Sequence, residues 1–314
     1  MGRMKREDSI RVQAKERTGE ETIESSDWTT FFRALATNEC DELVRNPDYL
    51  AKHFLVQNWM KYHLTILKRI RLLNFLLWYI ARYGLGGYCF VNARTKHIDA
   101  TLTEALNSGI EQFVILAAGN DSWPYRFREE LSGIRIFELD FPGTQNQKKD
   151  VLSKLFKMVP DHVTYVPIDF NSQSLKEVLE VEGYDSGKKT FFVWEGCANY
   201  LHETVVNSVL EFVAKNSPAG SLIVFDYVTR SFVEGDYSAY GAKRYAKAFK
   251  RMGEPCLSGI EADEVNTYLK ERGLSVVSIL APADLEHKYL RKRNGKLQGR
   301  IPGFFRVAYA EVPV

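Results

Sequence analysis

Cysteine is scarce in this 314-residue sequence: there are four cysteines, far apart, and no two stand in a CxxC pair. A disulfide scaffold and a zinc site are therefore disfavoured, and we predict no bound metal and a reduced, cytoplasmic setting. The first residues, 1–17, carry charges of both signs and lack an apolar core. They do not have the pattern of a secretory signal.

An excess of charge of one sign is also absent. Basic and acidic side chains number 42 and 40, a formal net charge of +2, which is too small to indicate nucleic-acid binding. Long apolar runs are missing as well. The strongly apolar stretch 72–80 lies between basic residues and falls short of the ~20 residues that span a bilayer. We interpret it as a buried helix, with a membrane-surface helix as the alternative, and expect no stable membrane insertion.

Aromatic residues are plentiful, with 19 Phe and 16 Tyr, so a sizeable core or an apolar pocket is possible. The chain divides into three parts by pattern. Residues 1–24 are polar, and we expect a disordered leader. Residues 25–110 have helical periodicity from Trp28 to Tyr83, a glycine-rich break, and a helix near 96–106, which together predict an N-terminal helical cover. From 111 to 314, strand and helix patterns alternate.

This alternation predicts an α/β fold with parallel strands and crossover helices on both faces of the sheet. The last strand is expected to run antiparallel or at an edge. A basic helical segment near 234–256 interrupts the rhythm, either to cover a pocket or as a solvated surface helix. The seven predicted strands are 112–117, 134–139, 163–168, 190–194, 221–227, 275–280 and 304–312. The predicted helices of this part lie near 122–131, 143–158, 172–181, 202–215, 261–271 and 282–292.

Three carboxylates stand where predicted strands end: Asp140, Asp169 and Glu195. The carboxyl ends of parallel strands line the ligand crevice of an open α/β sheet, so these side chains could hold hydroxyls, an amino group or a cation. Asp140 and Asp169 could instead only cap the helices that follow them. Glu195 lies between Trp194 and a glycine, and such a carboxylate needs a partner, either a ligand ammonium or an arginine.

The loop after the first predicted strand contains small residues, Ala117 and Gly119 among them. Small residues allow a tight turn and let backbone N–H groups approach a ligand. The loop has no GxGxxG, so the fingerprint of a dinucleotide-binding fold is absent. Asp121 or Ser122 could cap the next helix.

Four motifs in order resemble the leucine carboxyl methyltransferase family, most closely its bacterial and archaeal branch of small-molecule and polyketide O-methyltransferases. The pattern A-R-T-R/K-x-I/F-D, after an aromatic glycine turn, stands within residues 88–99, and L-G-A-G-x-D-T/S-x-x-Y-R-L/F stands at 116–127. F-E-V/I/L-D-x-P stands at 137–142, and W-E-G-x-x-x-Y-L at 194–201. The resemblance extends over about residues 27–311.

The resemblance implies a Rossmann-like class I methyltransferase: a seven-stranded, mostly parallel sheet with an antiparallel last strand, using S-adenosyl-L-methionine. By the same resemblance Arg94 holds the methionine carboxylate and Asp140 holds the ribose hydroxyls. Asp169 and Phe170 read adenine, and Glu195 lies near the methionine ammonium. The sequence departs from the family at Ala117, where the pattern has glycine.

The acceptor is open: a carboxylate or a hydroxyl of a small molecule, or the C-terminal carboxylate of a protein, as in the eukaryotic members. A carboxylate acceptor needs no base, whereas a hydroxyl needs one such as histidine. His97 is the histidine expected nearest the site, though a supporting role suits it better, and the catalytic residues are not predicted. A nicotinamide-dependent oxidoreductase and a non-enzymatic binding module are the competing hypotheses. The basic stretch 287–300 could engage an acidic substrate or be a solvated loop. The sequence does not indicate the oligomeric state.

Overall fold

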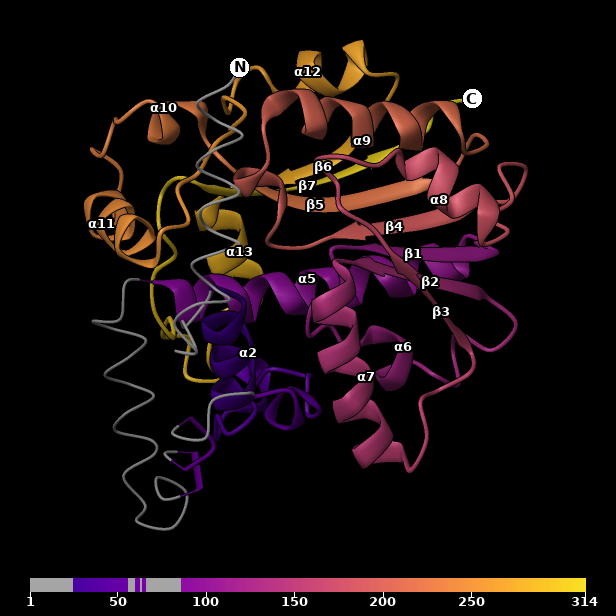
Figure 1. Ribbon diagram of the computed structural model, residues 1–314. Helices are drawn as coiled ribbons and strands as arrows, with labels where there is room; N and C mark the ends of the chain where they lie inside the picture. The colour runs from indigo at the N-terminus through magenta and orange to yellow at the C-terminus, as the bar shows by residue number, and fades with distance from the viewer. Residues whose placement is uncertain (1–24, 56–59, 63, 66–85) are drawn as a thin grey trace.

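The computed structural model describes residues 25–55, 60–62, 64, 65 and 86–314 (Figure 1). The predictions for the leader 1–24 and for the apolar stretch 72–80 fall outside the described residues. Of the helices that the structure describes, none combines the length and the hydrophobicity of a membrane span.

A seven-stranded sheet forms the centre of the fold, with strand order β3-β2-β1-β4-β5-β7-β6. The first five strands pair in parallel, and β7 pairs antiparallel with both β5 and β6. The predicted mostly parallel sheet with an antiparallel last strand is therefore confirmed. The strands are β1 (Gln112–Leu116), β2 (Arg135–Asp140), β3 (Val163–Pro167), β4 (Thr190–Trp194), β5 (Leu222–Val228), β6 (Ser275–Leu280) and β7 (Phe305–Glu311).

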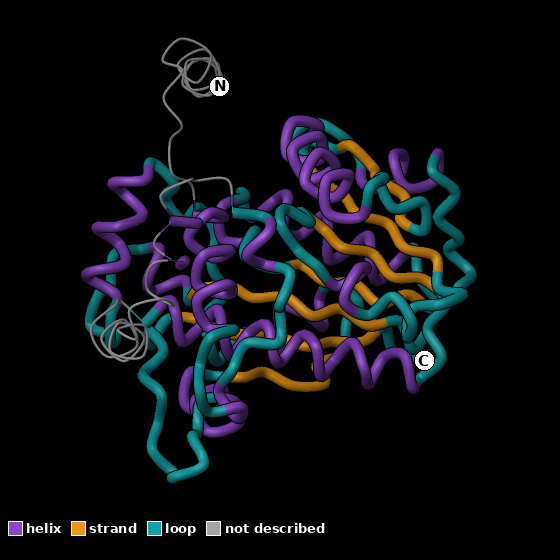
Figure 2. The backbone as a smooth tube through the Cα atoms, turned by 90° about the horizontal axis from the view of Figure 1, so that it is seen from below, coloured by secondary structure: helices purple, strands orange, loops and turns teal. Residues whose placement is uncertain are grey.

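Helices cover both faces of the sheet (Figures 1 and 2). Alternate strand residues enter two hydrophobic clusters, as the two-residue period of a strand requires. In β1, Phe113 and Ile115 join the cluster shared with α2, α5, α7 and α13, while Val114 and Leu116 join the one shared with α8, α9 and α12. These helices are α2 (Ser25–Ala36), α5 (Gly87–Asn107), α7 (Pro142–Phe156), α8 (Leu175–Val181), α9 (Glu203–Lys215), α12 (Val265–Glu271) and α13 (Pro282–Tyr289).

The remaining helices are short or lie outside this alternation. They are α6 (Trp123–Arg126), α10 (Arg230–Val233), α11 (Ala242–Met252) and the 3-10 turns η1 (Glu42–Val44), η2 (Ala51–His53) and η3 (Ala198–Tyr200). The helix predicted over 122–131 is thus a single turn. Within the helical pattern that begins at Trp28, α2 ends at Ala36, and turns with the short helices η1 and η2 follow it.

Helix α5 is longer than the predicted 96–106, because the glycines expected to break the helix stand at its start. Gly86 has φ 79° and precedes the first helical residue, a left-handed conformation that glycine adopts without strain. At Gly87 a Cβ atom would collide with the Tyr245 hydroxyl of α11. The glycines therefore allow α5 to begin directly against α11, which places the first turns of α5 over the carboxyl ends of the strands.

Candidate active site

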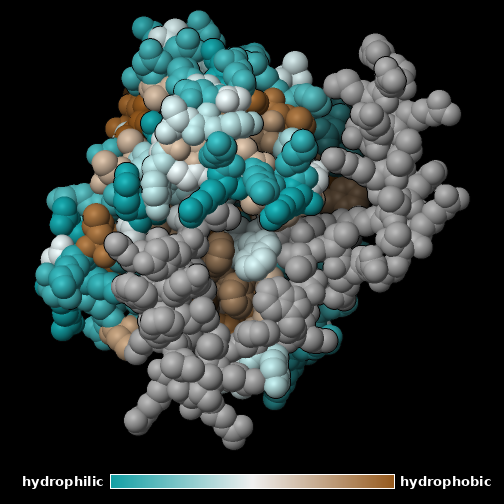
Figure 3. Space-filling model, turned by 90° about the vertical axis from the view of Figure 1, so that its left-hand side faces the viewer, coloured by the Kyte–Doolittle hydropathy of each residue, from teal (hydrophilic) through white to brown (hydrophobic). Residues whose placement is uncertain are grey.

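A cavity of about 1240 Å³ lies at the carboxyl ends of β1, β4 and β5. Between β1 and β4 the strand order reverses direction, and this switch point is where open α/β sheets bind ligands. The loop after β1 contributes Ala117 and Asp121, and the end of β4 contributes Glu195. Side chains of α2, α5 and α11 complete the wall. Figure 3 shows hydrophobic side chains at the bottom of a hollow on the side of the molecule that carries α10 and α11.

Arg94 is the centre of a buried charge cluster in this cavity. Its Nη2 donates to Glu195 Oε1 at 2.6 Å, and its Nη1 donates to Asp226 Oδ2 at 2.7 Å. The three side chains come from α5, the end of β4 and β5, and each is at most 7% exposed. Arginine therefore supplies the partner that the Glu195 carboxylate was predicted to need. Asp226 was not predicted from the sequence.

The second oxygen of Asp226 fixes the turn after β4. Its Oδ1 accepts a hydrogen bond from the Gly196 N–H at 2.6 Å. Gly196 has φ +65°, and a Cβ there would lie 3.4 Å from both Nη atoms of Arg94. Glycine suits this position because it adopts the left-handed backbone without strain. Asp226 thus orients both the arginine and the backbone turn.

Electrostatics hold the cluster in its charged form. Burial by itself would lower the pKa of Arg94, but the charges of Asp226 and Glu195 raise it. Burial raises the pKa of Asp226, while Arg94 and the Gly196 N–H oppose that rise. Arg94 and Asp226 therefore stabilise each other's charged forms away from water.

Two buried polar atoms of this cluster have no hydrogen-bond partner among the described residues: Glu195 Oε2 and Arg94 Nε. A buried carboxylate oxygen without a donor is costly, because its desolvation is not compensated. Arginine has five N–H donors, and Arg94 uses two of them in its ion pairs. The cluster therefore retains an acceptor and donors for a ligand that carries both an ammonium and a carboxylate.

Asp140, at the end of β2, faces the loop after β1. Its Oδ2 accepts from the Gly119 N–H at 2.6 Å and its Oδ1 from the Phe141 N–H at 2.6 Å. Between β1 and Gly119, Ala117 has φ 55°. The carboxylate and the small-residue loop that were predicted from the sequence are thus in direct contact, although neither Asp140 nor Gly119 is among the described residues that line the cavity.

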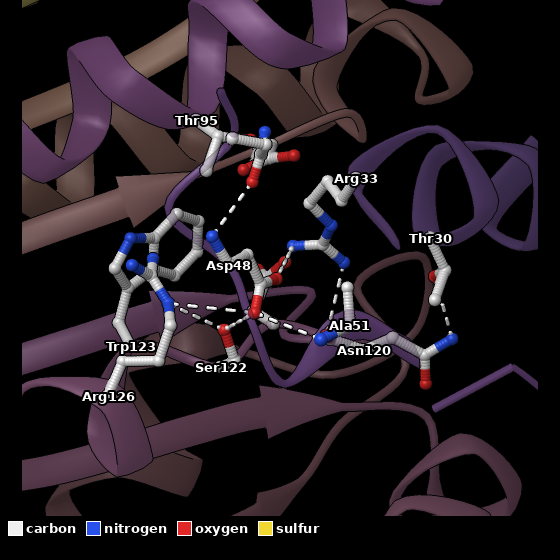
Figure 4. A network of polar contacts seen from close by, with 12 residues as sticks. Thr30, Arg33, Asp48, Ala51, Thr95, Asn120, Ser122, Trp123 and Arg126 are labelled. Atoms are coloured by element: carbon white, nitrogen blue, oxygen red, sulfur yellow. Dashed lines mark hydrogen bonds and ion pairs between the residues drawn. The ribbon is translucent and has the colours of Figure 1, made fainter. Parts of the chain in front are cut away.

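A polar network connects the N-terminal segment to the same loop (Figure 4). Arg33 of α2 donates to Asp121 at 3.0 Å and to the Asn120 carbonyl at 3.1 Å. Asp48 Oδ2 lies 3.6 Å from Arg33 Nη1, and Asp48 Oδ1 accepts a hydrogen bond from the Ser122 hydroxyl at 2.7 Å. The sequence analysis offered Ser122 as a possible cap of the following helix. Its side chain instead bonds to a carboxylate that is distant in the sequence. The network holds α2 over the cavity.

Comparisons with known proteins bear directly on this arrangement. The family model of leucine carboxyl methyltransferase matches residues 28–214. The chain belongs to the leucine carboxyl methyltransferase family.

Relatives and solved structures agree with this assignment. A Bacillus subtilis (strain 168) protein, YktD, whose name proposes an S-adenosyl-L-methionine-dependent methyltransferase, is 30% identical over 65% of this chain and 67% of its own. A Mycobacterium sp. (strain JLS) protein with the same proposed activity is 33% identical over 62% of this chain and 64% of its own. The matches thus span about two thirds of these relatives.

A crystal structure of a DUF574 family protein from Streptomyces avermitilis has the same fold, with a TM-score of 0.52 and 13% identity over 91% of this chain and 97% of that one. Family and fold together make the protein a class I methyltransferase that uses S-adenosyl-L-methionine.

Ala117, at a position where the family resemblance implies glycine, has a left-handed backbone conformation that favours glycine. A non-glycine residue in the left-handed region costs about 1 kcal/mol or more. We expect Ala117→Gly to raise the free energy of unfolding by about 1 kcal/mol, which urea denaturation can measure. The neighbouring Ala118 is buried and has no positive φ. Ala118→Gly is the matched control and should be destabilising; the same sign for both variants would contradict the assignment of strain to Ala117.

Asp169 and Phe170, at the end of β3, are not among the described residues that line the cavity. Asp169 accepts hydrogen bonds from the Asn171 N–H at 3.0 Å and from the Ser172 hydroxyl at 3.0 Å. Phe170 packs against the cluster beneath α8 and α9. The adenine-reading role of both residues stays a prediction of the family resemblance.

Three lining residues were missed as site residues by the sequence analysis: Arg33, Asp226 and His202. Asp226 stands in an apolar strand, so the argument that singled out Glu195 would also have found it. Arg33 was harder to find than Asp226, because the sequence shows it only as a single basic residue within an apolar helical pattern. His202 follows the fourth motif directly. These three positions are separated in the chain, and no local pattern joins them.

The histidine expected nearest the site lies elsewhere. His97 is not among the described lining residues; its Nδ1 lies 3.0 Å from the Tyr289 hydroxyl, on the side of α5 that packs against α13. Burial, assisted by the charge of Lys288, lowers the pKa of His97 to about 4. Among the described histidines, His202 is the one that lines the cavity.

Proposed function

We propose that this methyltransferase acts on an oxygen, a carboxylate or a hydroxyl, of a small molecule. One observation carries the placement of the cofactor in this proposal: the Arg94 cluster leaves an unbonded carboxylate oxygen and a spare guanidinium N–H beside a large cavity. A single ligand with an ammonium and a carboxylate would satisfy both, and the amino-acid end of S-adenosyl-L-methionine has these groups. The cofactor supplies an activated methyl group on a sulfonium.

In this proposal the chain's own residues bind and orient. Arg94 holds the methionine carboxylate through the N–H groups that its bonds to Asp226 and Glu195 do not use, and Glu195 accepts from the ammonium. Asp140 holds the ribose hydroxyls next to the backbone of Ala117 and Gly119. Asp169, with Phe170, reads adenine. Methyl transfer from sulfur to oxygen is an in-line displacement, so holding the acceptor in position supplies much of the rate.

The size and the lining of the cavity support a small acceptor. Ligand pockets usually measure 300–1,000 Å³, so about 1240 Å³ leaves room for a cofactor and a second small molecule. Aromatic side chains of α2, α5 and α11, among them Trp28, Phe90 and Phe249, also line the cavity, and the Phe90 ring lies 5.1 Å from the guanidinium carbon of Arg94. We also propose a cytoplasmic location, since cysteines are few, lie far apart in the sequence and form no CxxC pair.

Cofactor binding can be tested with the demethylated product, S-adenosylhomocysteine. Ligand binding raises the melting temperature through the free energy RT ln(1 + [L]/Kd), and we expect such a shift with this compound and none with NAD. Asp140→Ala should abolish the shift, because it removes the proposed ribose ligand. The exposed Asp161 serves as control, and Asp161→Ala should keep the full shift. Unchanged binding in Asp140→Ala would remove Asp140 from the site.

The acceptor class is tested with methyl-labelled cofactor and cell extract separated into small-molecule and protein fractions. Label in the small-molecule fraction is expected. Label found only in the protein fraction would favour a protein carboxyl methyltransferase instead. In the binding experiment, a rise of the melting temperature with NAD but not with S-adenosylhomocysteine would favour an oxidoreductase.

A further inference from the structure

We propose that His202 is the general base of the reaction and that the acceptor is a hydroxyl group of an uncharged small molecule, an alcohol or a phenol. The inference rests on the proposed O-methyl transfer and specifies its acceptor. It assigns a proton-transfer role to a side chain that the family motifs do not include.

His202 occupies an unusual place for a histidine. It is the N-cap residue of α9, and its carbonyl accepts from the N–H groups of Val205 and Val206 at 2.9 and 3.1 Å. Side chains at this position usually accept a hydrogen bond from the helix, and Ser, Thr, Asp and Asn are preferred for that reason. The imidazole makes no such bond. It lines the cavity and is exposed, so it can exchange a proton with water.

A hydroxyl acceptor needs such a group, and a carboxylate does not. In the proposed step the imidazole nitrogen of His202 takes the hydroxyl proton while the oxygen forms its bond to the methyl carbon. The carbon–sulfur bond breaks, its electron pair remains on sulfur, and the positive charge passes from the sulfonium to the imidazolium. His202 then releases the proton to water. Charge and atoms balance without a further reactant.

The charges in the cavity favour an uncharged acceptor. The described part of the wall contains the acidic side chains of Glu195, Asp226 and Glu254 and that of Asp121, whose pKa burial raises to about 8. The guanidinium groups in the wall are those of Arg33, Arg94 and Arg251. Arg33 and Arg94 are already held in buried ion pairs. Arg251 is exposed. Because the remaining N–H groups of Arg94 are assigned to the methionine carboxylate, a carboxylate acceptor would find no buried cation free to receive it.

The other ionisable side chains of the lining are less suitable as bases. Glu195 and Asp226 would lose their ion pairs to Arg94 on taking up a proton. Burial raises the pKa of Cys197 to about 12, and burial likewise raises the pKa values of Tyr200 and Tyr245. These three groups therefore keep their protons near neutral pH.

Asp121 is the main rival to His202. Burial and the nearby charge of Glu195 raise its pKa to about 8, against the opposing effect of Arg33. A carboxylate that titrates near neutral pH could also accept a proton. Its oxygen is bound to Arg33 at 3.0 Å within the network that holds α2, whereas the imidazole of His202 has no comparable structural bond. The experiment therefore includes both residues.

The test uses two matched probes, 2-naphthol and 2-naphthoic acid, which present a hydroxyl and a carboxylate on the same aromatic skeleton. With methyl-labelled cofactor, the protein should methylate 2-naphthol and leave 2-naphthoic acid unlabelled. His202→Thr should slow transfer to 2-naphthol about 100-fold or more at neutral pH, the usual range for loss of a general base. The deficit should shrink as pH rises, because the phenol then ionises without help, and added imidazole should restore part of the rate.

The melting temperature separates a catalytic role for His202 from a structural one. If His202 only stabilised the fold, His202→Thr would lower both the melting temperature and the transfer rate. Threonine is a better N-cap than histidine, so His202→Thr should have an equal or higher melting temperature while its transfer rate falls. His287, exposed on α13 and not among the described lining residues, provides the matched control. His287→Gln should retain the full rate and the full pH profile.

Several results would overturn the inference. It fails if His202→Thr transfers methyl to 2-naphthol at the parent rate. It also fails if the pH-dependent activity is lost in Asp121→Asn but kept in His202→Thr. It also fails if 2-naphthoic acid is labelled in preference, or if neither probe is labelled by a protein that binds S-adenosylhomocysteine. Absence of S-adenosylhomocysteine binding would instead refute the proposed function, so the two failures are distinguishable.

Discussion

Replacing Arg94 by Met is expected to lower the free energy of unfolding by about 3–5 kcal/mol, the usual cost of removing one partner from a buried ion pair. Two carboxylates, Glu195 and Asp226, are bonded to its guanidinium, and both would remain buried without a counter-charge. Methionine fills similar space, so loss of charge rather than loss of volume should dominate. Urea denaturation followed by circular dichroism measures the change.

A charge-matched variant provides the control. The triple substitution Arg94→Met, Glu195→Gln, Asp226→Asn removes the stranded charges and should recover much of the loss, because buried polar groups without net charge cost less. Lower pH should also relieve the single variant. Burial raises the pKa of Asp226 above its ordinary value, so without Arg94 the variant should lose stability as pH rises above the ordinary range of an aspartate. A triple variant no more stable than the single one would show that charge is not the cause.

The same substitution tests the role of Arg94 toward the cofactor. If its remaining N–H groups hold the methionine carboxylate, Arg94→Met should weaken S-adenosylhomocysteine binding far more than adenosine binding. Titration calorimetry on the two ligands measures the difference. Equal losses for both would place Arg94 in a structural role only.

Acid sensitivity is expected to depend on His97. Burial lowers its pKa to about 4, against 6.5 for the unperturbed side chain. Between these values the unfolded chain binds a proton that the folded chain does not, so the stabilisation is present above pH 6.5 and is lost as pH falls toward 4. At about 1.4 kcal/mol per pKa unit, the loss amounts to about 3 kcal/mol.

The variant His97→Gln should therefore show a shallower decline in the free energy of unfolding between pH 6.5 and 4. His287→Gln, which alters an exposed histidine, should decline as the parent protein does. Denaturation curves at several pH values measure the slopes, and NMR titration of the imidazole measures the pKa directly. Parallel slopes for the parent protein and His97→Gln would contradict the effect of burial on this group.

The parts of the fold that could be predicted are those that depend on neighbouring residues in the sequence, and the parts that depend on contacts between distant segments were missed. The predicted strands at 190–194 and 275–280 coincide with β4 and β6, because runs of β-branched and aromatic residues between turn signals depend only on neighbours. The start of α5 was missed because its glycines stand where Tyr245 packs against Gly87. Tyr245 and Gly87 are far apart in the sequence, so this contact could not be predicted. Here glycine permits a helix to begin, whereas the sequence analysis expected it to end one.

The candidate site divides in the same way. Asp140 and Gly119, predicted separately, lie in contact because both follow strands that are adjacent in the sheet. Arg94 and Glu195 were both predicted to meet the cofactor, but their bond to one another was not. The network that joins Arg33 to Asp121 had no local signal, since the two residues lie on segments far apart in the chain.

By itself, the sequence determined the alternation of strands and helices, the acidic strand ends and the small-residue loop, since hydrophobic period and turn chemistry act over a few residues. Only the tertiary structure decided which charges share a buried cluster, that Asp226 orients Arg94, and that His202 rather than His97 reaches the cavity. The physical reason is that desolvation and ion pairing depend on distances between atoms, and folding sets these distances between segments that no local pattern connects.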